Sequence, residues 1–203
     1  SPTVQVIPAD ERLSGELQGI LTAFKEPPQL EIVPIAVRNA YSLEVDDLVP
    51  EDIRYVGGKA ANFGFLRRAI PENSPEAIAF TFDLWTEFLD QVLITSGKTL
   101  RSEIEQRLAQ HSWPADIAVL REDLRAIRQL ITAEADFNET QRINILGALA
   151  PFDADRKIRF RSSTNVEYSE HITGAGLYDS YSGCVLDDTD GDAVGPSRCN
   201  TSQ

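Results

Sequence analysis

The chain has 203 residues, of which 42% are hydrophobic and 25% charged, a composition typical of a protein that buries a sizeable core. Its 19 basic and 32 acidic residues give a net charge of −13, which argues against nucleic acids or anionic membranes as partners, because both attract positive surfaces. No run approaches the roughly 18 consecutive apolar residues of a membrane helix.

The ends of the chain carry two further signals. The sequence begins with Ser1-Pro2 and contains no methionine, so we expect an excised domain or a processed piece of a longer protein. A removed signal peptide would leave the same kind of start. The two cysteines, Cys184 and Cys199, are close enough in sequence for a disulfide, and two free thiols are equally compatible with the pattern.

The first fifty residues predict a helix and a strand. Apolar residues at spacings of three and four predict an amphipathic helix over 10–25, which Pro27 ends. The apolar run 30–37 contains Pro34 and so suits an edge strand. The acidic residues 45–54 predict a loop.

A glycine pair, Gly57-Gly58, then opens a predicted helix. After a turn at 71–75, residues 77–82 predict a short strand. Asp83 has the residue type of an N-cap for the following helix. The apolar positions of that helix are expected to face inward: Leu84, Phe88, Leu89 and Val92.

Residues 97–150 are predicted to be mostly helical. Pro114 lies near the expected start of the second helix, and Asn138 with Gln141 predicts a capping box for the third. Amphipathic stripes usually pack inward, so we expect these residues in the core: Leu100, Ile104, Leu108, Ile117, Leu120, Leu124, Ile127, Ile131, Ile145, Leu146 and Leu149.

The last part of the chain predicts a strand at 157–160, followed by a polar turn and a glycine-rich stretch at 173–183. Beyond it, Asp187, Asp188, Asp190 and Asp192 offer spaced oxygen ligands of the kind that suits Ca²⁺. The remainder of the EF-hand pattern is missing, so a solvated acidic turn is the default and no metal-binding residues are assigned.

Three segments could bind an anion. In the first, Gly57 and Gly58 allow close backbone approach, a helix N-terminus follows, and Lys59 adds a positive charge. This is not a Walker P-loop, because the first glycine of that pattern is missing and Ala60 follows the lysine. A simple glycine turn before a helix is the alternative.

The second segment is Arg161-Ser162-Ser163-Thr164, with Glu167 close behind. An arginine at a strand end can hold phosphate oxygens through two N–H groups, and a surface salt bridge is the alternative. The third segment runs from Thr173 through Gly174 and Gly176, whose backbone N–H groups could form an anion-binding concavity.

Taken together and in this order, these segments resemble the nucleotide-binding domain of the phosphoenolpyruvate synthase and pyruvate phosphate dikinase family. The matching segments are Val56-Gly57-Gly58-Lys59-Ala60-Ala61-Asn62, the residues 77–89, Arg161-Ser162-Ser163 with Glu167, and Gly174-Ala175-Gly176-Leu177-Tyr178-Asp179-Ser180. The last segment is also similar to glucan water dikinases. The resemblance spans about residues 51–183.

The resemblance implies an α+β fold, the N-terminal lobe of an ATP-grasp-like domain, with a mainly helical insert at 97–150. Residues 1–50 and 184–203 lie outside the resemblance, and we expect a lead-in helix and strand in the first and an acidic, cysteine-containing tail in the second. The resemblance further implies ATP and Mg²⁺ as cofactors. Lys59 and Arg161 would be the catalytic cations on the ATP phosphates, and the remaining binding residues would be Gly57, Gly58, Ser162, Glu167, Thr173, Gly174 and Gly176.

The implied activity is phosphoryl transfer to a histidine on another domain, and onward to pyruvate or another acceptor. The second ATP lobe and the phosphohistidine domain would lie outside these 203 residues, so we expect the chain to be inactive alone. A need for ATP implies the cytoplasm, and the two cysteines leave an extracytoplasmic location open. The alternative is a non-catalytic module that binds a nucleotide, or a protein through the helical insert.

Overall fold

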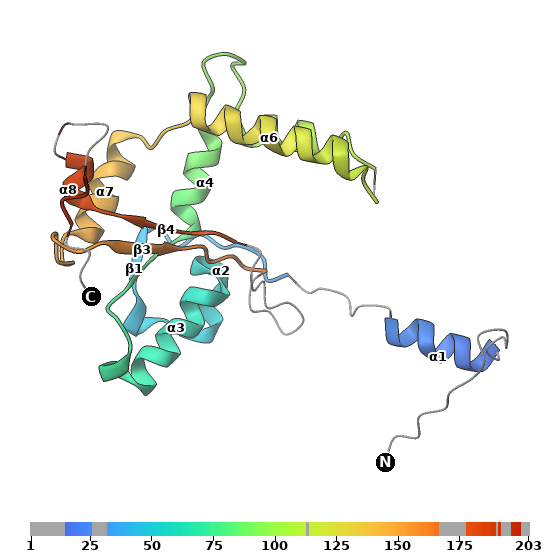
Figure 1. The fold of residues 1–203 in the computed structure, drawn as a ribbon, viewed down its shortest axis with the longest axis horizontal. Coiled ribbons are helices and arrows are strands. Elements are labelled where there is room, and N and C mark those ends of the chain that lie inside the picture. Colours follow the sequence, from blue (N-terminus) through green and yellow to red (C-terminus); the bar gives the residue numbers. More distant parts are fainter. Residues whose placement is uncertain are drawn as a thin grey trace. The chain divides into compact units, whose positions relative to one another are not determined.

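A computed structural model describes residues 15–25, 32–112, 114–166, 178–189, 191 and 196–199. The chain divides into two units, Ser1–Glu31 and Ile32–Gln203 (Figure 1). In the first unit, helix α1 (Gly15–Lys25) confirms the described part of the predicted N-terminal helix. Its apolar residues Leu17, Ile20 and Leu21 are exposed.

The second unit combines helices with two small antiparallel sheets, which confirms the α+β class. Strand β1 (Ser42–Glu44) pairs with β2 (Ile78–Phe80), and β3 (Ile158–Arg161) pairs with β4 (Ser180–Gly183). The predicted strands near 77–82 and 157–160 therefore exist, each with shifted ends.

The predicted edge strand at 30–37 is wrong over its described residues, 32–37. The Ala36 N–H donates to the Arg54 carbonyl, 3.0 Å away, within an irregular segment. β2 instead takes β1, which begins five residues after this segment, as its partner.

A first core lies where short helices meet helix α3 (Gly58–Ala69). The predicted loop at 45–54 is instead a series of short helices: η1 (Val45–Asp47), η2 (Pro50–Asp52) and the start of α2 (Ile53–Val56). The loop prediction failed because this acidic stretch also buries Val45 and Leu48 against α3. A Cβ on Gly64 would lie 2.5 Å from the Val45 carbonyl oxygen, so only glycine permits this contact.

Helix α4 (Phe82–Asp90) follows β2 directly. Thr81, not the predicted Asp83, occupies the N-cap position. The Asp83 carboxylate, in the first turn, instead accepts backbone N–H groups from Arg38, Asn39 and Ala40 at 2.5–3.3 Å. Asp83 thus fixes the chain that leads into β1.

A second polar link joins the same region to the helices. Glu87 on α4 accepts hydrogen bonds from the Tyr41 hydroxyl and from Asn138 Nδ2. The bond to Glu87 raises the pKa of the Tyr41 phenol, because it favours the protonated hydroxyl.

The helical region contains α5 (Leu100–Leu108), α6 (Ile117–Glu134) and α7 (Glu139–Leu149), as predicted for 97–150. Asn138 and Gln141 form the predicted capping box of α7. Asp116 caps α6 by accepting the N–H groups of Ala118 and Val119, which leaves Pro114 outside the helix. A second core joins α5 and α6 to α4: Phe88, Leu89, Leu93 and Leu100, with Ile104, Leu130 and Ile131 against them.

Several predicted core residues are exposed instead. Val92 is 66% exposed, and in α6 only Ile127 is buried while Ile117 is 65% exposed and Leu124 43%. Leu108 and Leu146 are also exposed. The periodicity identified the helices correctly, but the second core covers only the C-terminal half of α6.

Two short elements complete the described fold: η3 (Pro71–Asn73), between α3 and β2, and α8 (Val185–Thr189), after β4. The structure pairs Cys184 and Cys199 in a disulfide, and both side chains are buried. The Arg198 N–H donates to the Asp187 carboxylate at 2.6 Å, which lowers the pKa of Asp187 and holds the tail against α8. The described part of the acidic tail therefore contains one short helix and is cross-linked by the disulfide.

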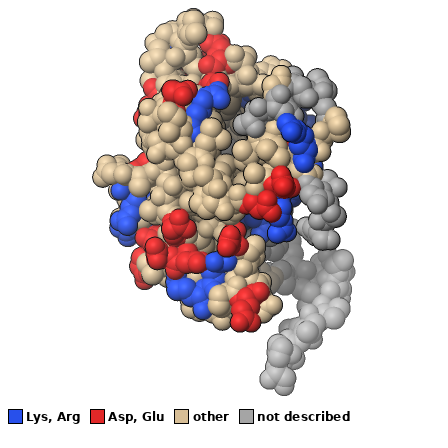
Figure 2. Space-filling model, turned by 90° about the vertical axis from the view of Figure 1, so that its left-hand side faces the viewer, with Lys and Arg blue, Asp and Glu red and all other residues tan. Residues whose placement is uncertain are grey.

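None of the helices described is long and apolar enough to cross a bilayer. On the face in Figure 2, acidic and basic side chains lie next to one another around a broad uncharged area. Asp46 and Arg67 form an ion pair, with 2.6 Å between Asp46 Oδ1 and Arg67 Nε; the hydrogen bond from Arg67 lowers the pKa of the Asp46 carboxyl.

Candidate functional site

The first candidate segment, residues 57–60, is a tight turn that we call the glycine turn. Gly57 ends α2 with φ of +83°, and Gly58 is the first residue of α3. A Cβ on Gly57 would lie 2.6 Å from both the carbonyl carbon and the Oγ of Ser163. Glycine is therefore required at position 57 for two reasons: its φ is positive, and a segment more than 100 residues later in the sequence leaves no room for a Cβ.

That later segment, residues 162–164, we call the hydroxyl turn. The Gly58 N–H donates to the Thr164 carbonyl at 3.0 Å, and the Ala60 N–H donates to Ser163 Oγ at 3.0 Å. The sequence suggested that N–H groups at the start of α3 would receive an anion. Two of them are already bonded to the hydroxyl turn, so these two N–H groups serve to hold the turns together.

Lys59 lies across this contact. Its Nζ donates to Ser162 Oγ at 3.2 Å, and the lysine is half-buried. Ser162 directly follows Arg161, the exposed last residue of β3. The structure thus brings Lys59 to the residue next to Arg161, across a sequence separation of 103 between Lys59 and Ser162.

The pairing of β3 with β4 explains why the hydroxyl turn is placed here. Arg161 stands opposite Ser180 in the antiparallel register, so the connection between the strands leaves and returns at the same end of the pair. That end is the one beside Lys59. On the same pair, Arg159 donates to Ser182 Oγ at 3.1 Å and so contributes to the sheet.

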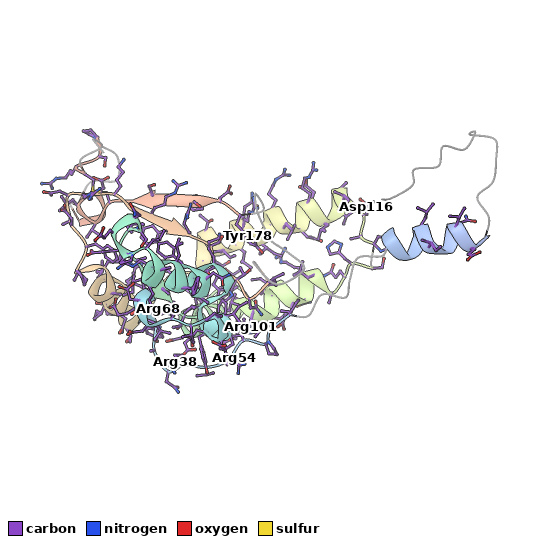
Figure 3. The ribbon with its side chains drawn as sticks, turned by 90° about the horizontal axis from the view of Figure 1, so that it is seen from below. Arg38, Arg54, Arg68, Arg101, Asp116 and Tyr178 are labelled. Atoms are coloured by element: carbon purple, nitrogen blue, oxygen red, sulfur yellow. A yellow bond between two sulfur atoms is a disulfide. The ribbon has the colours of Figure 1, made fainter. Side chains whose placement is uncertain are left out.

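The predicted residues Glu167, Thr173, Gly174 and Gly176 lie outside the described residues. Tyr178, just before β4, is described and partly exposed, and it lies well away from Asp116 at the start of α6 (Figure 3).

Two contributors were not assigned from the sequence. Ser163 bonds the start of α3, and Asn165 Nδ2 donates to the Val33 carbonyl at 2.7 Å, which anchors the end of the hydroxyl turn to the segment before β1. The Ser162-Ser163 pair is visible in the sequence, but nothing local indicates that the second serine contacts Gly57, more than 100 residues earlier.

The site therefore offers an ammonium group, serine hydroxyls and a neighbouring arginine on a backbone held by hydrogen bonds. Such a set can bind a phosphate or a carboxylate. Across the described ranges, no three His, Cys, Asp or Glu side chains come together as metal ligands. The described side chains thus fit an anion and provide no cage for a metal ion.

No protein-family model matches the chain, and no curated protein sequence matches it either.

Proposed function

We propose that the glycine turn and the hydroxyl turn form a phosphate-binding site for ATP, in the nucleotide-binding lobe of a phosphotransferase similar to phosphoenolpyruvate synthase and pyruvate phosphate dikinase. The observation that carries the proposal is the hydrogen bond from Lys59 Nζ to Ser162 Oγ, which joins two of the four segments that carry the family resemblance. A lysine alone is common at a helix start, but a lysine held beside a strand-end arginine is a typical phosphate arrangement.

The roles follow from position. Lys59, half-buried, would neutralise charge on the phosphates, and Arg161, exposed at the strand end, would bind phosphate oxygens through its planar guanidinium. Ser162 would exchange its bond with Lys59 for a bond to the ligand. Gly57 and Ser163 would keep the lysine in place without touching the ligand.

ATP would supply the transferred phosphoryl group, with Mg²⁺ carried by its phosphates. In this proposal the fold is the N-terminal lobe of an ATP-grasp-like domain, and phosphate passes to a histidine on another domain and then to pyruvate or another acceptor. The chain's own residues contribute binding and charge stabilisation, which are the main sources of rate in phosphoryl transfer.

Isothermal titration with ATP and Mg²⁺ tests the proposal in the wild-type protein and in Lys59→Ala and Arg161→Ala. Each substitution is expected to weaken binding at least tenfold, about 1.4 kcal/mol. Lys98→Ala is the matched control, because Lys98 bonds Gln106 and approaches Glu103 on α5, away from the two turns. Unchanged affinity in both site variants contradicts the assignment.

One observation favours a second candidate, a non-catalytic module that keeps the fold. The hydroxyl turn occupies two N–H groups at the start of α3, which phosphate would otherwise use. For such a module, ATP would bind without any phosphate appearing on a histidine of the assembled protein, and transfer of ³²P from ATP labelled at both the β- and the γ-phosphate separates the two candidates.

A further inference from the structure

Helix α6 carries an amphipathic pattern that the fold uses only in part. In its C-terminal half Ile127 is buried, and Leu130 and Ile131 pack against the second core. The pattern continues through Leu124, Leu120 and Ile117, yet Ile117 and Leu124 are exposed and Leu120 is half-buried. The N-terminal half of α6 extends beyond α4 (Figure 1), with Asp116 at its tip (Figure 3).

The exposed side of this half also carries arginines. Arg121, Arg125 and Arg128 follow one another at spacings of four and three, on the side that bears Ile117 and Leu124. We call this set the arginine stripe: Ile117, Leu120, Arg121, Leu124, Arg125 and Arg128. A surface hollow of about 400 Å³ runs along it.

The charge of the stripe opposes that of the whole protein. The chain has a net charge of −13, and the stripe concentrates three arginines. Arg125 is bonded to Glu122 at 2.6 Å, whereas in the described part of the chain neither Arg121 nor Arg128 forms an ion pair. On the opposite side of the helix, Asp123 lies 2.9 Å from His111.

We propose that the arginine stripe binds an acidic amphipathic helix of a partner protein. The partner's apolar residues, spaced by three and four, would cover Ile117, Leu120 and Leu124, as in helix pairing. Its Glu or Asp side chains would flank that seam and meet Arg121, Arg125 and Arg128. This inference does not depend on the proposed nucleotide site, which lies on other elements.

The probe is a synthetic 21-residue helical peptide with Leu at positions a and d and Glu at e and g of each heptad, labelled for fluorescence anisotropy. Like charges at e and g keep such a peptide from pairing with itself. We expect micromolar binding to the wild-type protein, weakening at least tenfold between 50 and 500 mM salt. The same peptide with Lys in place of Glu is expected to bind at least tenfold more weakly.

Two variants locate the site. Arg121→Glu/Arg128→Glu is expected to weaken binding of the acidic peptide at least tenfold, and Ile117→Ser/Leu124→Ser at least fivefold. The control, Arg156→Glu/Lys157→Glu, makes the same change in net charge at exposed positions before β3 and is expected to stay within twofold of wild type. Circular dichroism confirms that each variant is folded.

Three results would overturn the proposal. These are a dissociation constant above 1 mM for the acidic peptide, equal binding of the Lys peptide, or no effect of the arginine reversal in a folded variant. Analytical ultracentrifugation tests one further outcome. If the wild-type protein is a dimer and the arginine reversal dissociates it, the stripe binds a second copy of the chain, and the proposal of an acidic partner helix is wrong. A binding-competent monomer supports it.

Discussion

Two regions of the molecule can be compared: the junction between the glycine turn and the hydroxyl turn, and the N-terminal half of α6. Both have clear sequence patterns, but the fold provides a packing partner only for the first. At the junction, the Gly57-Gly58 pair meets a segment more than 100 residues away, and three hydrogen bonds join them. On α6, the apolar positions continue toward the N-terminus beyond the residues that the second core covers, and Ile117 and Leu124 are exposed. A local pattern thus specifies an element, while its partner must come from elsewhere in the chain or from another molecule.

The largest effect is expected at Gly57. Gly57→Val places a branched side chain at φ of +83° and within 2.6 Å of Ser163. Strain and overpacking together should lower the free energy of unfolding by about 4 kcal/mol. The control is Gly147→Ala in α7, where nothing lies within 4 Å of an added Cβ and helix propensity should add stability. Urea unfolding measures both, and equal stability of the two variants would show that the junction does not form.

A smaller effect is expected at Ser163. Ser163→Ala removes the acceptor of the Ala60 N–H and should cost about 1–2 kcal/mol, because that part-buried amide loses its partner. Ser162→Ala, which removes only the bond to the Lys59 side chain, should cost less. Hydrogen exchange gives a second readout: the Ala60 amide should lose protection in Ser163→Ala alone. Retained protection would mean that another group accepts this N–H.

The smallest effect is expected on α6. Ile117→Ser should change the free energy of unfolding by less than about 0.5 kcal/mol, because the side chain is 65% exposed. Leu100→Ala is the contrasting variant: this side chain is fully buried in the second core, and its loss should cost about 2–5 kcal/mol. Thermal unfolding compares them. A large loss in Ile117→Ser would mean that the stripe packs against the protein itself.

What the sequence predicted correctly was mostly local. The two partners of the capping box, Asn138 and Gln141, are three positions apart, and both of its hydrogen bonds are present as expected. The helices at 97–150 followed from periodicity. Asp83 shows the limit: its residue type indicated an N-cap, yet its carboxylate binds three N–H groups at 38–40. No property of the residues around Asp83 indicates a partner more than forty positions away.

The site was predictable to the same extent. Lys59 and Arg161 were selected by residue type and by resemblance, and the contact of Lys59 with Ser162 depends on how β3 and β4 place the hydroxyl turn. The start of α3, taken by itself, predicts that two of its N–H groups bind an anion. In the folded protein both N–H groups donate hydrogen bonds within the chain, to Ser163 Oγ and to the Thr164 carbonyl.

The most direct test of the central claim is a two-dimensional ¹⁵N–¹H NMR titration of the protein with ATP and Mg²⁺. If the two turns form one phosphate site, amide resonances of residues 57–60 and of residues 161–164 will shift together and fit a single dissociation constant, and both sets of shifts will be lost in Lys59→Ala. Shifts confined to one of the two segments, or no shifts at millimolar ATP, would contradict a shared site.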